Sequence, residues 1–138
     1  MESCTGGLLA SMLTDIQGSS RFFSGGFVTY SNKIKESMGV PKDILEKYGA
    51  ISPECATAMA LSARDKTGAS IGVGITGIGG PNSIEDKEPG LAYIAICDGK
   101  RSKVREGIFP TNRQDFKLRV ARTAMFEIQG WIKGVIDV

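Results

Sequence analysis

The sequence predicts an α/β domain, a three-layer α/β/α sandwich in which helices cover both faces of a mixed sheet. Two observations lead to this prediction. Apolar residues at helical spacing alternate along the chain with short runs of small and β-branched residues. Two of these runs, residues 91–97 and 103–109, flank the turn-forming pair Asp98-Gly99, which is typical of an antiparallel hairpin. The length of 138 residues suits one core, so we expect a single domain over residues 1–138.

The first predicted helix follows a turn rich in hydroxyl side chains and glycine at residues 3–7. It begins near Thr5, and a second such turn at residues 18–20 ends it. Aromatic and β-branched residues then predict a short strand near residues 26–30. In α/β folds a glycine-rich turn that opens a helix normally follows a strand. Only two residues precede Ser3, so we expect that strand to be missing here.

Three helices are predicted in the next part of the chain. Residues 33–37 follow the N-cap pair Ser31-Asn32, and residues 42–48 follow Pro41 and end at Gly49. Residues 53–67 begin after Ser52 with proline in the first turn and carry apolar residues at helical spacing. The last of these is predicted to be an amphipathic helix.

The second half of the chain predicts a strand, a long loop, the hairpin and a final helix. Residues 69–76 form the strand, and the loop continues to residue 90. From Asn112 onward an apolar stripe recurs every four residues, which predicts one long helix with the stripe in the core; its members are Phe116, Val120, Ala124, Ile128, Ile132 and Ile136.

Composition excludes several classes of protein. The formal net charge is +2 and charges of both signs are interleaved, so nothing demands a nucleic acid or a membrane partner. No stretch is long enough to span a bilayer and no basic leader follows Met1, so we expect a cytoplasmic protein. Three cysteines without a CxxC pair argue against a disulfide framework and a zinc site.

The chain contains no histidine, which excludes Ser-His-Asp and Cys-His catalytic groups and histidine-bound zinc within one chain. A serine nucleophile would therefore need a lysine or tyrosine partner, and burial can lower the pKa of such a lysine. Lys35 is the favoured candidate because it lies one helical turn beyond Ser31, close to Tyr30, although Lys33 is near. The competing interpretation of either lysine is an ordinary solvated residue.

A GxGxxG match occurs at residues 72–77, but it lies within the predicted strand and does not open a helix. Close packing explains these glycines better than dinucleotide binding. The hydroxyl- and glycine-rich turns at residues 3–7, 18–20 and 76–81 are of greater interest, because main-chain N–H groups in such turns bind phosphates or stabilise an oxyanion. Each turn taken alone is also explained by capping. Cys4 is a second candidate nucleophile. The competing interpretation is a small buried side chain without a chemical role.

Taken together, these residues resemble the CinA carboxy-terminal domain family over nearly the whole chain. The resemblance is carried by residues 2–7 (ESCTGG), 13–15 (LTD), 18–20 (GSS), Phe23 with 25–26 (GG), 30–32 (YSN) with Lys35, 39–40 (GV), 49–52 (GAIS), 76–81 (TGIGGP) and 89–90 (PG). No single segment is specific; their collinear order is.

The resemblance implies hydrolysis of the carboxamide of nicotinamide mononucleotide, giving nicotinic acid mononucleotide and ammonia. It implies Ser3 as the nucleophile, with Lys35 and Tyr30 activating it and relaying protons. The residues implied to order the site or bind substrate are Thr5, Gly6, Gly7, Ser20, Asn32, Thr76, Gly77 and Arg113. Lys117 stands where arginine is common in the family, which would weaken a bidentate phosphate contact.

The resemblance implies a small-molecule nucleotide as the partner and no metal or other cofactor. It is also compatible with a homodimer. Family members usually have a helix and a strand before the Glu-Ser-Cys motif, and many carry an additional amino-terminal domain; neither is expected here. The alternative is a non-catalytic nucleotide-binding or interaction domain that keeps the glycine loops without turnover.

Overall fold

The computed structural model describes residues 1–134, and its centre is a mixed sheet. Strands β1 (Gly72–Gly77), β2 (Leu91–Cys97) and β3 (Ser102–Ile108) pair antiparallel in the order β1-β2-β3. Glu2 extends this sheet, because it forms parallel bridges to Ile75 on one side and to Val28 on the other. Residues 1–3 thus occupy a strand position beside β1.

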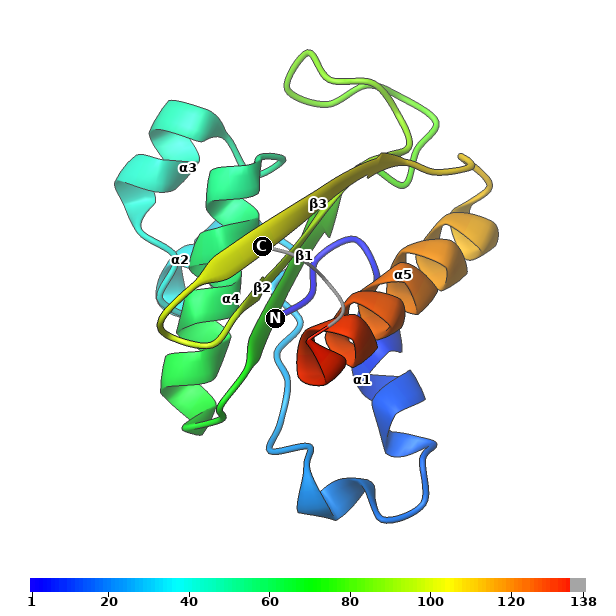
Figure 1. The fold of residues 1–138 in the computed structure, drawn as a ribbon. Coiled ribbons are helices and arrows are strands. Elements are labelled where there is room, and N and C mark those ends of the chain that lie inside the picture. Colours follow the sequence, from blue (N-terminus) through cyan, green and yellow to red (C-terminus); the bar gives the residue numbers. More distant parts are fainter. Residues whose placement is uncertain (135–138) are drawn as a thin grey trace.

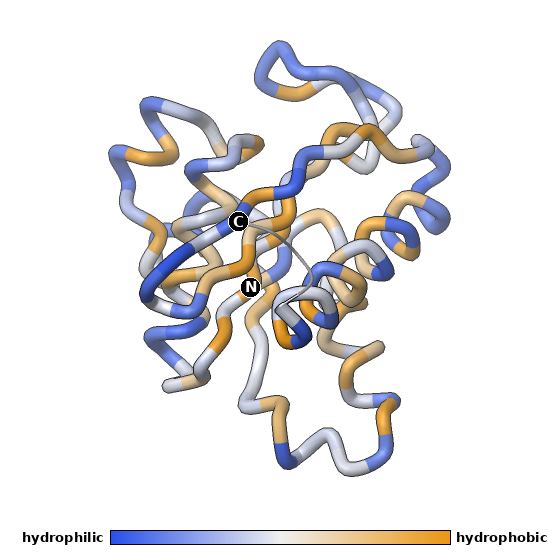
Figure 2. The backbone as a smooth tube through the Cα atoms, viewed as in Figure 1, coloured by the Kyte–Doolittle hydropathy of each residue, from blue (hydrophilic) through white to orange (hydrophobic). Residues whose placement is uncertain are grey.

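Helices cover both faces of the sheet, which confirms the three-layer prediction (Figure 1). Helix α4 (Pro53–Thr67) packs on one face of β1 and β2, with the short helices α2 (Asn32–Ser37) and α3 (Lys42–Tyr48) on the same side. Helices α1 (Leu8–Thr14) and α5 (Arg113–Lys133) pack together against the opposite face. Strand β2 is buried along its whole length, and the predominantly apolar colour of this region in Figure 2 marks the core.

Capping residues set the helix boundaries much as the sequence predicts. The side chains of Ser31, Ser52 and Asn112 each accept a hydrogen bond from the N–H three residues later, at the start of α2, α4 and α5. The first helix is an exception, since it begins at Leu8 and not near Thr5. Gly6 and Gly7 have φ angles of 62° and 101°, which a right-handed helix cannot include.

The predicted strand near residues 26–30 is reduced to a single bridged residue, Val28. Its neighbours complete the pairing with Glu2, since Phe27 O accepts from Glu2 N and Thr29 N donates to Glu2 O. The pairing is short because Gly25 and Gly26, which lack side chains to pack, come immediately before it. This brief pairing nevertheless fixes the residues just before Tyr30.

The glycines of β1 allow the strand to lie directly on α4. A Cβ atom on Gly72 would come within 2.1 Å of Ala60 O, and one on Gly74 within 2.1 Å of Ala56 O. No side chain fits between these two backbones. The close-packing interpretation of the GxGxxG match is therefore confirmed.

The apolar stripe of α5 is buried only in its first half. Phe116, Val120 and Ala124 are buried, whereas Ile132 is 69% exposed. A four-residue step advances about 40° beyond a full helical turn, so the stripe rotates away from the sheet. Residues at a three-residue offset, Glu127 and Trp131, are buried instead, and Ile136 lies outside the described residues.

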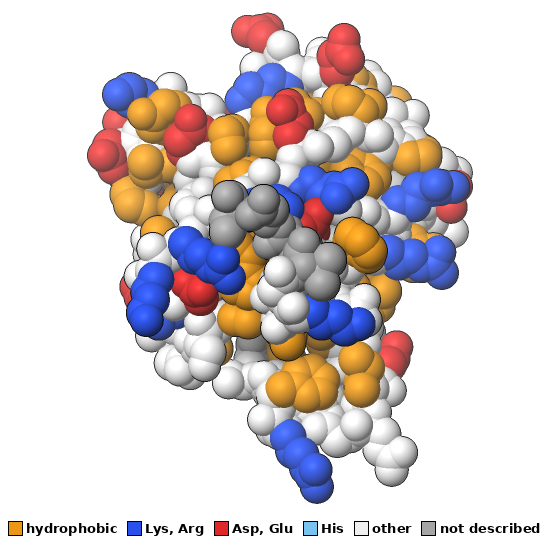
Figure 3. Space-filling view, viewed as in Figure 1, with side chains coloured by type: hydrophobic (Ala, Val, Ile, Leu, Met, Phe, Trp, Pro, Cys, Tyr) orange, Lys and Arg blue, Asp and Glu red, His pale blue; other side chains and the backbone are white. Residues whose placement is uncertain are grey.

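Charged side chains of both signs share the face shown in Figure 3 with apolar ones. Three basic residues on β3 or just before it contact α5: Arg101 stacks on the Trp131 ring, while Lys103 and Arg105 pair with Glu127. Within residues 1–134, no helix combines the length and the apolar character that crossing a bilayer requires.

Candidate active site

Ser3 stands at the end of the strand position formed by residues 1–3. Its N–H donates to Ile75 O over 2.9 Å, and its carbonyl accepts from Gly6 N over 3.0 Å. Only 7% of the residue is exposed. The main chain of Ser3 is therefore held on one side by the sheet and on the other by the turn that follows it.

The buried carboxylate of Glu2 fixes this turn to α1. One oxygen accepts from Thr5 Oγ1 over 2.6 Å and from Leu9 N over 2.9 Å, and the other accepts from Ala10 N over 2.9 Å. The N–H groups belong to the first turn of α1, where a negative charge is favourable. Glu2 thus supplies the helix cap that Gly7, the residue preceding α1, has no side chain to provide.

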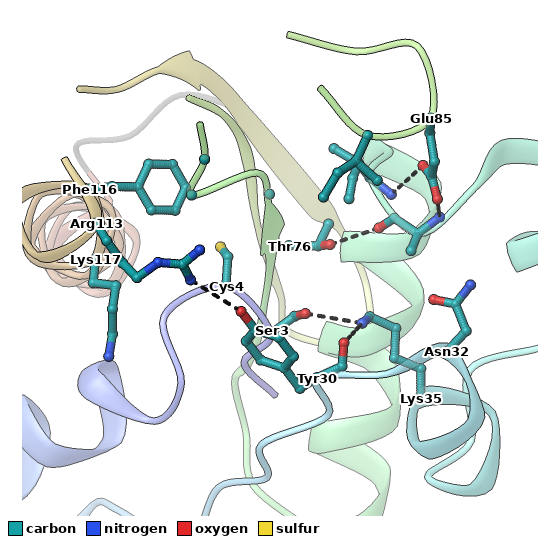
Figure 4. A pocket seen from close by; sticks show the side chains of 16 residues that line it. Ser3, Cys4, Tyr30, Asn32, Lys35, Thr76, Glu85, Arg113, Phe116 and Lys117 are labelled. Atoms are coloured by element: carbon teal, nitrogen blue, oxygen red, sulfur yellow. Dashed lines mark hydrogen bonds between the residues drawn. The ribbon is translucent and has the colours of Figure 1, made fainter. Parts of the chain in front are cut away.

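Lys35 reaches Ser3 from α2 and is 1% exposed. Its Nζ donates to Ser3 Oγ over 3.0 Å and to the main-chain carbonyl of Tyr30 over 3.2 Å (Figure 4). It also donates to the main-chain carbonyl of Thr29 over 2.9 Å. Thr29 belongs to the segment that pairs with Glu2, and Tyr30 is the residue that follows it. The same pairing that places Ser3 therefore also places the acceptors of its lysine.

Burial lowers the pKa of Lys35 from its ordinary value of 10.5, because the charged ammonium is poorly solvated there. The thiols of Cys55 and Cys4 and the carboxylate of Glu85 act weakly in the opposite direction. Among the hydrogen-bond partners of Nζ in the described chain, all are neutral oxygens. The surroundings therefore make the neutral amine easier to reach than in a solvated lysine. In that form its two N–H bonds can serve the two carbonyls while its lone pair faces the Ser3 hydroxyl.

A cavity of about 260 Å³ opens above this pair. The structure brings seven of the residues implied by the sequence resemblance to its wall: Ser3, Tyr30, Asn32, Lys35, Thr76, Gly77 and Arg113. Thr76 uses its hydroxyl to hold the wall, since Oγ1 donates to Ala50 O over 2.7 Å.

The mouth of the cavity is basic. Arg113 and Lys117 lie one turn apart near the start of α5, and both line the cavity. Arg113 Nη1 makes a long contact of 3.5 Å to the hydroxyl of Tyr30, which is 62% exposed. Arg113 and Lys117 thus place two positive charges at the mouth, so an anionic ligand would be attracted to it.

Four residues expected at the site lie outside the cavity wall. Ser20 is exposed on the short 3₁₀ helix η1 (Ser19–Arg21). Thr5 is fully buried and donates to Glu2, the N–H of Gly6 is used within the turn, and Gly7 precedes α1. Thr5, Gly6 and Gly7 thus shape the turn that presents Ser3, whereas Ser20 belongs to a different segment.

The Tyr30 hydroxyl does not lie where a proton relay between Lys35 and Ser3 would place it. Its contact with Lys35 is through the main-chain carbonyl, and its hydroxyl points to Arg113 at the mouth (Figure 4). Among the described hydrogen bonds, none joins the phenol to Ser3. This arrangement favours a role in binding, next to Arg113.

Sequence analysis missed Glu85, which also lines the cavity. It lies in the polar loop between β1 and β2, where no periodicity or motif distinguishes one acidic residue from another. Lys117 was noted only as a departure from the family pattern. Its position four residues after Arg113 was the available signal, because that spacing puts both side chains on one helix face.

Cys4 lines the cavity, but burial raises the pKa of its thiol to about 12. A thiol that remains protonated is a poor nucleophile. We therefore predict that Cys4→Ala keeps kcat/KM within about twofold of the unmodified chain. Catalytic rates measured before and after iodoacetamide treatment check this, and rapid inactivation that the substitution abolishes would contradict it.

No group of three or more His, Cys, Asp or Glu side chains in residues 1–134 is arranged to hold a metal ion.

Comparison with known proteins gives consistent matches. Residues 1–132 match the family model described as CinA C-terminal domain. CinA-like proteins of Koribacter versatilis and Syntrophomonas wolfei are 47% and 44% identical to this chain over 126 residues. Those alignments cover 90% of this chain but 30% of each relative, so the chain spans less than a third of these curated relatives.

Solved structures agree over most of the chain. The competence/damage-inducible protein of Agrobacterium tumefaciens is 36% identical and superposes with a TM-score of 0.88, covering 94% of this chain and 81% of that one. A CinA superfamily protein of Enterobacter cloacae is 30% identical, also with a TM-score of 0.88, covering 92% and 76%.

Proposed function

The chain belongs to the CinA C-terminal domain family, and from this premise we propose that it is an amidohydrolase that converts nicotinamide mononucleotide to nicotinic acid mononucleotide and ammonia. The contact of 3.0 Å between Lys35 Nζ and Ser3 Oγ carries this proposal. A buried amine next to a serine hydroxyl replaces the histidine that the chain lacks.

In the first half of the proposed reaction, Ser3 Oγ attacks the carboxamide carbon while Lys35 Nζ accepts the hydroxyl proton. The tetrahedral intermediate collapses when its C–N bond breaks. Lys35 returns the proton to the departing nitrogen, which leaves as ammonia. An ester between Ser3 and the nicotinoyl group remains.

In the second half, water attacks the ester carbon and Lys35 accepts a proton from it. The C–O bond to Ser3 then breaks, and the proton returns to the serine oxygen. The product acid ionises at neutral pH, so each turnover consumes one water and releases one ammonia. Lys35 acts as base and then acid in both halves, which requires that its amine exchange protons near the working pH.

The basic mouth of the cavity supports a substrate with a phosphate group. Arg113 can form two parallel hydrogen bonds to a phosphate, whereas Lys117 offers a single charged group. The ribose phosphate would lie between them while the carboxamide faces Ser3. Tyr30, next to Arg113, would complete this end of the binding site.

The test is ammonia release from nicotinamide mononucleotide, with nicotinamide riboside as the matched substrate that lacks the phosphate. We expect turnover of the nucleotide and a higher KM for the riboside. Binding of the nucleotide by calorimetry without ammonia release would favour the non-catalytic nucleotide-binding alternative.

We predict that kcat/KM rises with pH, with a half-maximum below pH 10.5. The proposed base must be neutral, and burial lowers the pKa of Lys35 from that value. Activity is therefore lost as the pH falls through the pKa of Lys35, because the amine becomes protonated. A pH profile of kcat/KM checks this, and a rate that increases toward low pH would contradict a lysine base.

A further inference from the structure

Glu85 lines the cavity from the loop between β1 and β2, and its carboxylate is held by main chain from a different part of the fold. Oε2 accepts from Ala50 N over 2.9 Å, and Oε1 accepts from Ile51 N over 3.0 Å. The two residues follow α3 and also line the cavity. Figure 4 shows this contact on the side of the cavity away from Arg113 and Lys117.

The fit of this carboxylate depends on the residue before Ala50. A Cβ atom on Gly49 would lie 2.4 Å from Glu85 Oε1, so only glycine leaves room for the contact. The carbonyl of Ala50 is held from the other side by the Thr76 hydroxyl, over 2.7 Å. Both polar groups of Ala50 are thus used to connect the loop after α3 to the region of β1.

The segment that carries Glu85 is a tight turn in a strained conformation. Ile84 and Lys87 pair with one another across it, and Glu85 and Asp86 have φ angles of 55° and 59°. The left-handed conformation is unfavourable for glutamate, whereas glycine, asparagine and aspartate adopt it more readily, so the cost lies mainly at Glu85. A contact outside the turn must offset this conformational cost. The hydrogen bonds from Ala50 N and Ile51 N to the Glu85 carboxylate supply that contact.

Lys87 provides a second connection between the same two segments. Its Nζ donates to the carbonyls of Ile51 and Tyr48 and lies 3.8 Å from the Glu85 carboxylate. The turn is therefore joined to the loop after α3 by one anionic and one cationic side chain. Ile51 and Ile84, which belong to these two segments, both line the cavity and contribute to its apolar wall, as does Phe116.

We propose that Glu85 is a positioning residue that holds the Ile84–Lys87 turn against residues 49–51, and so forms the wall on which the flat ring of the substrate packs. The statement that the substrate ring packs on this wall rests on the proposed function. The Ser3 and Lys35 contacts come from other segments, residues 1–3, 29–30 and α2. Loss of Glu85 should therefore weaken substrate binding while leaving the chemical step intact.

The experiment compares Glu85→Ala and Glu85→Gln with Glu88→Gln, a matched change of charge at an exposed position of the same loop. The first measurement is hydrogen exchange of the Ala50 and Ile51 amides by NMR. We expect at least about 10-fold faster exchange in Glu85→Ala, since both acceptors are lost, a smaller effect in Glu85→Gln, and none in Glu88→Gln.

The second measurement is the kinetics of ammonia release. On the high-pH plateau of the profile, where the Lys35 amine is neutral with or without the Glu85 charge, we expect KM in Glu85→Ala to rise by roughly 5- to 10-fold with kcat within about twofold. Unchanged amide exchange in Glu85→Ala would overturn the proposal. Faster exchange with an unchanged KM would also overturn it, whether or not kcat falls. If the unmodified chain releases no ammonia, the proposed function fails, and the exchange rates alone decide whether Glu85 holds the wall.

Discussion

Replacing Lys35 with methionine is expected to lower kcat for ammonia release by at least about 10³-fold, the scale seen when a catalytic serine loses its base. Methionine fills a similar volume but cannot accept the Ser3 proton. Ser3→Ala should have a comparable effect, and the double variant should be no worse than either single one, because both residues act in the same step. Initial rates on nicotinamide mononucleotide provide the measurement.

Lys33→Met is the matched control for this prediction. Lys33 lies on the same short helix and is exposed, whereas Lys35 is 1% exposed and bonded to Ser3. The control should retain full activity. Circular dichroism and thermal unfolding establish that the Lys35 variant is folded, and a folded Lys35→Met chain with normal kcat would exclude the proposed base.

Gly74→Ala is expected to destabilise the fold by at least about 3 kcal/mol, or to prevent folding altogether. The new methyl group would lie 2.1 Å from Ala56 O and 2.7 Å from Ala60 N. Both atoms belong to the helix backbone of α4, so no side-chain rotation can make room. The strand must move off the helix, and the contact between the sheet and one of its two layers is lost. Urea unfolding measures the change in free energy.

Gly26→Ala makes the same chemical change where space exists. The closest atoms to its added Cβ, in Ala10 and Phe23, lie at 3.5 Å, an ordinary contact. We expect a change within about 0.5 kcal/mol. Equal unfolding midpoints for the two alanine variants would show that β1 and α4 are not packed as closely as described.

The sequence predicts elements whose signals are local. The start of α4 after Ser52 and the Asp98-Gly99 turn between β2 and β3 both depend on a few neighbouring residues, and each was placed correctly. Sequence analysis favours Lys35 over the neighbouring Lys33 only by its spacing from Ser31, because two positions of one short helix differ chiefly in what packs against them. Burial separates them in the structure.

The contacts that shape the candidate site could not be predicted in this way. Glu85 binds the main chain of Ala50 and Ile51 across a large separation in the chain, and a carboxylate-to-amide contact leaves no periodic pattern. Glu2 presents the same difficulty, since a buried acid is rare and its three donors become visible only when α1 is in place. Residue types identified Ser3, but its surroundings are a property of the tertiary fold.

The position of Glu2 between Val28 and Ile75 has a consequence for folding kinetics. The nucleophile is aligned only after segments far apart in the chain have paired, and its lysine is 32 residues away. Such non-local contacts form slowly compared with helices. Partly folded chains should therefore contain much of the helical structure yet have no activity. On refolding, the far-ultraviolet signal would recover before turnover, so the return of ammonia release reports the completion of the native state.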